Sequence, residues 1–197
     1  MSYKVILASS SKTRKKILED YGIQAKIIPH KVNEKLIKEK ENLKPKKLVE
    51  KLAMLKAKLI AEKKTSKDHF VIGSDQILIC GDKRMDKATN LEQAYANMLF
   101  LNDKEHMLFS SSYVYKNMKE IWSATKIAVI HMKKLTKLQI KDYISKNTNI
   151  VLETVGGYKV ENDVMKCIVI KSGNLEVVQG FPIGGFVTYL KTKIRKL

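Results

Sequence analysis

The sequence has little cysteine, with only two among its 197 residues. Cys80 and Cys167 are far apart, lie among apolar residues and form no C-x-x-C pair. Cysteine-rich metal clusters and disulfide frameworks need more cysteines at regular spacing, so the sequence supports neither of them. We therefore expect two buried free thiols in a reducing cytoplasm.

Long hydrophobic runs are also missing at the start of the chain. The segment MSYKVILASSSK contains one short apolar stretch, which is too brief for a signal-peptide core and far too brief to cross a bilayer. There is no internal repeat and no low-complexity linker. We expect a cytoplasmic protein without a membrane partner. Its length and its 44% hydrophobic content favour one domain over residues 1–197, with a cleft.

Arginine is scarce although the chain is strongly basic. The formal net charge is +18, yet only three of the 38 basic residues are arginine: Arg14, Arg84 and Arg195. A basic surface attracts polyanions, but proteins that read base edges or phosphates usually favour the planar fork of arginine. Because the lysines are spread along every segment, the composition argues against specific nucleic-acid binding. A non-enzymatic, lysine-rich module that binds RNA or DNA stays as an alternative function.

Hydrophobic patterning in the first third predicts an α/β mixture. A short buried strand over Tyr3–Ala8 leads through the serines at 9–11 into a helix over Lys12–Tyr21. A second strand is predicted over Gln24–Pro29. The lysine-rich segment His30–Lys44 is too charged to be core, and we interpret it as a mobile flap.

The middle of the chain contains one amphipathic helix and one buried strand. The helix is predicted over Pro45–Lys64. The segment Phe70–Cys80 is almost wholly apolar, which is typical of a strand buried on both faces, and Gly81-Asp82 then forms a turn. The leucines that define the apolar face of the helix are Leu48, Leu52, Leu55 and Leu59.

Capping signals and turns organise the second half. Capping boxes at Asn90–Gln93 and Thr136–Gln139 predict helices that run through Leu101 and Lys146. A final helix is predicted after Pro182. Two antiparallel hairpins are also predicted: His106–Tyr115 with Ile121–Met132 around a turn at Asn117, and Lys166–Val178 with its turn at Gly173-Asn174.

The segment Leu7–Leu18, LASSSKTRKKIL, is the first candidate site because a strand delivers hydroxyls to the start of a helix. Ser9 and Ser11 can donate hydrogen bonds to phosphate oxygens. Lys12, Arg14 and Lys15 place positive charge where the helix dipole disfavours it, which indicates an anionic ligand. The alternative is that the serines only cap the helix and the lysines are solvated.

Asp75 is the second candidate, because it lies within the apolar strand Phe70–Cys80. An ionised carboxylate buried there loses its hydration unless a cation, a metal ion or a hydrogen-bond donor compensates it. Buried acids of this kind are common in functional sites. The alternative is an aspartate near the strand end that backbone amides satisfy.

These pieces together resemble the Maf family of nucleotide pyrophosphatases, with the segments in the family's order from about Val5 to Leu190. The family's L-A-S-x-S-P-x-R pattern has a counterpart that retains its serines and its arginine, although Lys12 replaces the usual proline. The other matching positions are Glu34; Leu52, Ala53, Lys56 and Ala57; Gly73 and Asp75; Lys87, followed by Ala88 in place of proline; Gly156, Gly157 and Tyr158; and Gly180, Phe181 and Pro182.

The resemblance implies a fold and an activity. The fold is α/β, with a long twisted mixed β-sheet flanked by helices and two lobes around a cleft, and the family commonly forms homodimers. The activity is hydrolysis of a nucleoside triphosphate to a monophosphate and pyrophosphate. The resemblance implies that Asp75 is catalytic, and that Glu34 and Asp75 bind a divalent metal ion, Mg²⁺ or Mn²⁺. It implies phosphate contacts from Ser9, Ser11, Arg14, Lys56 and Lys87.

Three further positions resemble determinants of substrate choice in the family. Gln76 and Glu161 stand where the branch that prefers 7-methylguanosine triphosphate has these residues, whereas the branch that cleaves dTTP and UTP has threonine and glutamine. Thr13 matches neither branch, because the first has tryptophan there and the second arginine. We expect a substrate similar to 7-methyl-GTP, with dTTP or UTP as the alternative. The family name has also been linked to cell-division control, for which the sequence offers no support.

Overall fold

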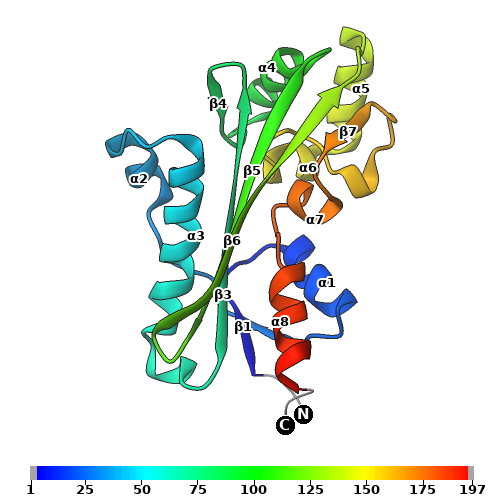
Figure 1. Cartoon of the computed structure of the whole chain (residues 1–197). Helices are drawn as coiled ribbons and strands as arrows, with labels where there is room; N and C mark the ends of the chain where they lie inside the picture. The colour runs from blue at the N-terminus through cyan, green and yellow to red at the C-terminus, as the bar shows by residue number, and fades with distance from the viewer. Residues whose placement is uncertain (1–3, 195–197) are drawn as a thin grey trace. The chain divides into compact units, whose positions relative to one another are not determined.

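The computed structural model describes residues 4–194 and confirms an α/β fold built on a mixed sheet of seven strands (Figure 1). The strand order is β2-β1-β3-β5-β6-β7, and β4 pairs with β3. The strands are β1 (Val5–Leu7), β2 (Ala25–Ile27), β3 (Phe70–Cys80), β4 (Lys83–Met85), β5 (Glu105–Lys116), β6 (Lys119–Met132) and β7 (Ile168–Ser172).

Eight α-helices and two 3₁₀ turns are found among the described residues. The helices are α1 (Lys12–Asp20), α2 (Glu34–Lys40), α3 (Pro45–Ala61), α4 (Leu91–Leu101), α5 (Lys137–Lys146), α6 (Thr148–Glu153), α7 (Leu175–Val178) and α8 (Gly184–Ile194). The 3₁₀ turns are η1 (Lys64–Ser66) and η2 (Val160–Asn162). In the described part of the chain, no helix combines the length and the apolar character that crossing a membrane would need.

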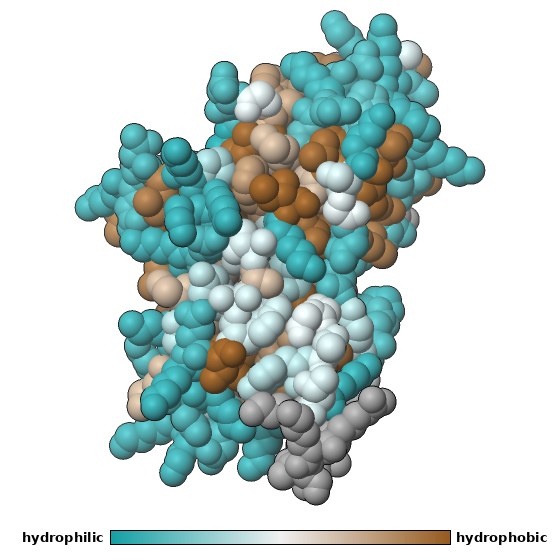
Figure 2. Space-filling view, in the orientation of Figure 1, coloured by the Kyte–Doolittle hydropathy of each residue, from teal (hydrophilic) through white to brown (hydrophobic). Residues whose placement is uncertain are grey.

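The chain divides into two compact units. Unit 1 comprises residues 1–76, 110–126 and 180–197, and unit 2 comprises residues 77–109 and 127–179. Each unit has its own hydrophobic core: that of unit 2 is built from α4, α5, α6 and the strand residues that face them. On the face shown in Figure 2 most of the surface is hydrophilic, as the high lysine content requires.

Side chains of the unit 1 strands alternate between the two faces of the sheet. Apolar side chains on each face pack against helices. β1 pairs in parallel with β2 and with β3, so that Leu7 lies opposite Ile72. Val5, Leu7 and Ile72 face the core shared with α1 and α8. Ile6 and Val71 point the other way, toward α3. Figure 1 shows α3 on one side of these strands and α1 with α8 on the other.

Helix α3 packs unusually close to β3 at Gly73. A Cβ atom added to Gly73 would lie 2.5 Å from the carbonyl oxygen of Ala53 and would also collide with the backbone of Ala57. Only glycine opposite alanines allows this approach. Because β3 alternates, Gly73 and Asp75 share the face toward α3, whereas Ser74 points to the opposite face.

The apolar face of α3 differs from the predicted one. Leu48 and Leu52 are buried, but Leu59 is 38% exposed and Ile60 is buried in its place. The predicted spacing counted leucines only. The observed face also includes small residues and one charged residue, Lys56, which is 4% exposed. A single lysine on a buried helix face requires an explanation.

One prediction for the second half was wrong, and another was confirmed in part. The segment Lys166–Val178 is not a hairpin, since β7 pairs with β6 and the residues after Gly173 form α7. Asn174 caps this helix, because its side chain accepts a hydrogen bond from the backbone of Val177 at 3.1 Å. The predicted cap of α4 is present in half: the side chain of Asn90 accepts from the backbone of Gln93 at 2.8 Å, but the side chain of Gln93 accepts from the backbone of Thr89 and not from that of Asn90.

The lysine-rich segment after β2 was predicted to be a flap outside the core. No residue of α2 is buried, in agreement with that expectation. The segment nevertheless forms a short helix, which Asn33 caps by accepting from Leu36 at 3.1 Å. Both cysteines are free and buried, as expected.

Candidate active site in unit 1

The loop after β1 holds the two serines of the first candidate site. Ser11 is the N-cap of α1 and accepts a hydrogen bond from the backbone of Arg14 at 3.3 Å. The backbone of Ser11 in turn donates to the hydroxyl of Ser9 at 3.2 Å. Ser9 is 5% exposed and lies 3.5 Å from a guanidinium nitrogen of Arg14. Ser11 therefore caps the helix, and Ser9 contacts the partly buried guanidinium of Arg14.

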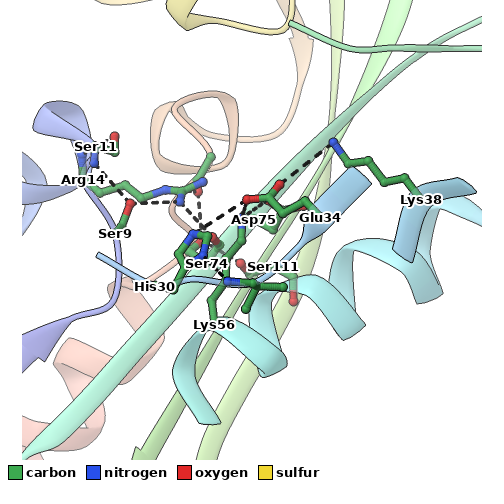
Figure 3. A network of polar contacts seen from close by, with 12 residues as sticks. Ser9, Ser11, Arg14, His30, Glu34, Lys38, Lys56, Ser74, Asp75 and Ser111 are labelled. Carbon is green, nitrogen blue, oxygen red and sulfur yellow. Dashed lines mark hydrogen bonds and ion pairs between the residues drawn. The ribbon is translucent and has the colours of Figure 1, made fainter. Parts of the chain in front are cut away.

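The side chain of Arg14 extends from α1 toward Ser74 (Figure 3). Its Nε donates to the carbonyl of Gly180 at 3.1 Å, and its Nη1 donates to the carbonyl of Ser74 at 2.8 Å. Burial lowers the pKa of Arg14, while the negative charges of Asp75 and Glu34 oppose that shift. An arginine has a very high starting pKa, so the guanidinium stays charged. Its position therefore brings positive charge beside two carboxylates.

Lys56 joins the two carboxylates that the sequence singled out. Its Nζ lies 2.6 Å from Oδ1 of Asp75 and 2.8 Å from Oε1 of Glu34. Lys56 comes from α3, Asp75 from β3 and Glu34 from the start of α2 (Figure 3). The close packing at Gly73 sets the distance between α3 and β3, and so makes the buried ion pair with Asp75 reachable.

Asp75 is compensated by a cation, as the sequence analysis allowed. It is 5% exposed, and its Oδ1 accepts the hydrogen bond from Lys56. Its other oxygen, Oδ2, is buried and has no hydrogen-bond partner. A buried carboxylate oxygen without a donor is costly, and native proteins keep such atoms mainly where a ligand or water completes them. The carboxylate of Asp75 is thus prepared to accept one more group.

Glu34 is held by several positive groups. Its Oε1 lies 3.7 Å from Nε2 of His30, and its Oε2 lies 4.0 Å from Nζ of Lys38. Partial burial raises the pKa of Glu34, but the charge and hydrogen bond of Lys56, with Lys38 and His30, outweigh burial and leave the pKa lowered. Glu34 is therefore ionised at neutral pH.

His30 is a member of this network that the sequence analysis did not single out. Its Nδ1 accepts a hydrogen bond from the backbone of Val32 at 3.4 Å, so in the neutral ring Nε2 carries the proton that faces Glu34. Burial lowers the pKa of His30, and the charge of Lys56 lowers it further. No local pattern in the sequence marks His30. Its contact with Glu34 depends on helix α2, whereas the high charge of this segment predicts a flap.

Buried hydroxyls support the opposite face of β3. Ser74 is fully buried, and its hydroxyl donates toward the carbonyl of Ser111 at 2.6 Å and lies 2.9 Å from that of Gly180. The hydroxyl of Ser112 donates to that of Ser74 at 3.1 Å. These bonds fix the backbone of Ser74 and Gly180, whose carbonyls hold Arg14.

The carboxylates of Glu34 and Asp75 fit a hard divalent cation in donor type. Mg²⁺ is usually bound by one or two carboxylates together with substrate phosphates, and a dedicated protein cage is uncommon. Within the described residues no group of three or more His, Cys, Asp or Glu side chains could hold a metal ion by itself. Two carboxylates, one with a buried oxygen that lacks a partner, match a cation that arrives with phosphate ligands.

The other predicted site residues are placed as follows. Gln76 lies at the end of the unit 1 part of β3, and its Nε2 donates to the hydroxyl of Ser110 at 3.0 Å. Thr13 lies in α1, next to Arg14. Lys87 and Glu161 belong to unit 2: Lys87 is exposed between β4 and α4, and Glu161 is exposed in η2. Their assigned roles stay predictions.

Comparisons with known proteins agree with this geometry. The family described as Maf-like protein matches residues 4–193, which include both units. A relative from Pelagibacter ubique (strain HTCC1062), named nucleoside triphosphate pyrophosphatase, is 32% identical over 97% of this chain and 98% of its own length. A protein of the same name from Granulibacter bethesdensis is 30% identical, over 95% of this chain and 96% of that protein.

One relative has a narrower name. A protein from Bdellovibrio bacteriovorus named 7-methyl-GTP pyrophosphatase is 34% identical over 91% of both chains. The family match covers nearly the whole length of the chain. It agrees with the network formed by Ser9, Arg14, Glu34, Lys56 and Asp75. The chain belongs to the Maf-like protein family.

Proposed function

We propose that this protein hydrolyses the bond between the α and β phosphates of a nucleoside triphosphate, releasing a nucleoside monophosphate and pyrophosphate. The observation that carries the proposal is the charged network in which Arg14, Lys56, Glu34 and Asp75 meet beside the serine loop. Family membership supports the same enzyme class, because the full-length relatives are named as pyrophosphatases.

The positive groups of the site suit the charge that develops during this reaction. Attack of water on the α phosphorus places negative charge on the phosphoryl oxygens and on the leaving pyrophosphate. Arg14 and Lys56 would stabilise that charge, and the hydroxyls of Ser9 and Ser11 would donate hydrogen bonds to phosphate oxygens. Lys87 would add a third cation, as the resemblance to the family implies.

Asp75 is the group that would orient and deprotonate the attacking water. Its Oδ2 has no partner and can accept a hydrogen bond from that water without first breaking the contact of Oδ1 with Lys56. A divalent ion held by Glu34 and Asp75 would supply charge neutralisation at the phosphates when it is bound. Glu34 is kept ionised for this purpose by Lys56, Lys38 and His30.

For the substrate we propose a nucleotide similar to 7-methyl-GTP. Glu161 would accept hydrogen bonds from the donor edge of a guanine-like base, whereas a glutamine would offer both a donor and an acceptor. Gln76 supports the same choice through the resemblance, and the relative from Bdellovibrio bacteriovorus carries that substrate in its name. Thr13 provides no aromatic surface, so base stacking must be weaker than a tryptophan would give.

A nucleotide screen tests both the proposed reaction and the proposed substrate. Purified protein is incubated with 7-methyl-GTP, GTP, dTTP and UTP, with and without Mg²⁺ or Mn²⁺, and pyrophosphate and monophosphate are quantified. We expect metal-dependent pyrophosphate release with 7-methyl-GTP as the preferred substrate. Preference for dTTP or UTP would reject the substrate assignment and keep the enzyme class. No pyrophosphate from any triphosphate, with salt-sensitive RNA binding instead, would favour the non-enzymatic alternative.

A further inference from the structure

Lys56 occupies a notable position between the two carboxylates that would hold a metal ion. Its single ammonium group contacts Oδ1 of Asp75 at 2.6 Å and Oε1 of Glu34 at 2.8 Å. We infer that Lys56 is an internal counter-cation, which neutralises Glu34 and Asp75 in the nucleotide-free protein and keeps divalent ions from binding until a triphosphate draws the lysine away. This inference rests on the proposed function, because it concerns the same site.

The burial of Lys56 shows that the ion pairs are required in the free protein. The side chain is 4% exposed, and lysines are almost never buried without a charged partner. The side chain of Asp75 is buried as well, with 8% exposed, and that of Glu34 is half-buried, with 32% exposed. In such surroundings screening by water and salt is weak. A divalent ion would therefore meet carboxylates whose charge is already compensated.

Lys56 is the basic residue whose ammonium group lies within hydrogen-bonding distance of both carboxylates. The guanidinium of Arg14 is hydrogen-bonded to the carbonyls of Ser74 and Gly180. Lys38 contacts Glu34 at 4.0 Å, and His30 contacts it at 3.7 Å. The neutralisation of Asp75 by direct contact thus depends on Lys56, which makes this lysine the group to test.

A triphosphate would change the balance of charge at Lys56. Its phosphate oxygens offer the ammonium group several new acceptors, and lysine can follow them because its four-carbon stem is flexible. Once Lys56 turns to phosphate, Oδ1 of Asp75 and Oε1 of Glu34 lose their cation, and Oδ2 of Asp75 already has no partner. The carboxylates then favour a divalent ion. We therefore expect the cation to enter as its complex with the nucleotide.

The test measures Mn²⁺ binding to the nucleotide-free protein, by the electron paramagnetic resonance signal of free Mn²⁺ and by calorimetry. Lys56→Met removes the charge and keeps an unbranched apolar stem. We expect the wild type to bind Mn²⁺ weakly and Lys56→Met to bind it at least about tenfold more tightly, since a positive charge next to both carboxylates is lost. The matched control is Lys38→Met, which removes a charge 4.0 Å from Glu34 and should give a clearly smaller gain.

Stability measurements guard against a variant that fails to fold. Lys56→Met leaves the buried Asp75 and the half-buried Glu34 without their shared cation, so its melting temperature should fall, and Mn²⁺ should raise it more than in the wild type. Lys56→Gln, which keeps a hydrogen-bond donor, should behave in the same direction. If neither variant folds, the Mn²⁺ affinity of the nucleotide-free wild type is the test. A Kd in the millimolar range supports the inference, and a Kd in the micromolar range overturns it.

Equal or weaker Mn²⁺ binding by a folded Lys56→Met would also overturn the inference and leave Lys56 as a phosphate contact only. Because these measurements need no turnover, they separate the two proposals. A protein that releases no pyrophosphate but gains Mn²⁺ affinity in Lys56→Met contradicts the proposed function alone. Normal pyrophosphate release without that gain contradicts the role of Lys56 as a counter-cation alone.

Discussion

A polar cluster in unit 1 and a polar pair in unit 2 differ in charge. In unit 1, Lys56, Glu34 and Asp75 form an ionised network with one carboxylate oxygen that lacks a partner. In unit 2, His106 and Tyr158 form a hydrogen-bonded pair, with 2.6 Å between Nε2 and the hydroxyl and their rings packed edge to face. Burial lowers the pKa of His106 to about 4 and raises that of Tyr158, so this pair is neutral at pH 7.

This difference in charge is what we expect if the unit 1 cluster has the proposed catalytic role and the unit 2 pair stabilises the fold. Neutral buried pairs stabilise a core when they are hydrogen-bonded, and they carry no charge to offer a ligand. Buried ion pairs give little net stability, because desolvation offsets their attraction. Charged groups that are shielded from water and grouped together are common at binding and catalytic sites. We therefore expect changes in unit 1 to affect turnover and changes in unit 2 to affect stability.

Asp75→Asn gives the largest expected effect on turnover. Asparagine can still accept the hydrogen bond from Lys56, so the fold should persist, but it cannot take a proton from water. We expect pyrophosphate release to fall by about 10²- to 10⁴-fold, as is typical when a general base is removed. The measurement is initial-rate pyrophosphate release, with circular dichroism to check folding. Asp20→Asn, on the exposed face of α1, is the control, and wild-type rates in Asp75→Asn would exclude the assigned role.

Gly73→Ala should disrupt the ionised cluster through the backbone. The new Cβ would lie 2.5 Å from the carbonyl oxygen of Ala53, so α3 must move away from β3 and carry Lys56 from Asp75. Overpacking of this kind costs about 1–3 kcal/mol or more in the free energy of unfolding. Urea unfolding and pyrophosphate release are measured together. Gly81→Ala is a useful control because an added Cβ there meets no neighbour, although its φ of +58° adds some strain. Unchanged stability in Gly73→Ala would contradict the close approach.

The neutral cluster predicts a dependence of stability on pH. In the unfolded chain His106 takes up a proton near pH 6.5, whereas in the folded protein it does so only near pH 4. Between these values the unfolded state holds more protons, so the free energy of unfolding falls as the pH drops from about 6.5 to about 4. The loss should reach about 3 kcal/mol at most, and no further loss from this group occurs below about pH 4.

His106→Gln provides the comparison for that prediction. Glutamine cannot titrate, so the variant should be less stable at pH 7 but lose less stability than the wild type between pH 6.5 and pH 4. Chemical unfolding at a series of pH values measures the difference. The lowered pKa of His30 acts in the same direction, yet it is present in both proteins and cancels. Parallel curves for the two proteins would show that His106 does not supply the pH dependence.

Local signals in the sequence predicted most of the elements. The strand predicted over Phe70–Cys80 is β3 with the same bounds, and α5 has the predicted capping box at Thr136 and Gln139. These signals are local, because alternation, capping and turns depend on residues a few positions apart. The segment after Gly173 was mistaken for a strand since its apolar run is too short to show a period, and Asn174 decided for a helix.

The candidate site was visible only in part. The sequence marked the serine loop, Arg14 and Asp75 through local conflicts between charge and surroundings. It gave no sign of His30, of the Ser74 carbonyl or of the Gly180 carbonyl, because those contacts join residues far apart in the chain. Lys56 could be located only through a family pattern, since one lysine among so many has no distinguishing local signal.

The sequence by itself determined that a buried carboxylate and a serine-lined helix start exist, because burial and helix capping follow from neighbouring residues. The tertiary structure alone decided that one lysine ammonium lies between Glu34 and Asp75. The reason is physical: that position requires α3 to approach β3 at a glycine, and such an approach depends on the shape of two surfaces that no local pattern describes.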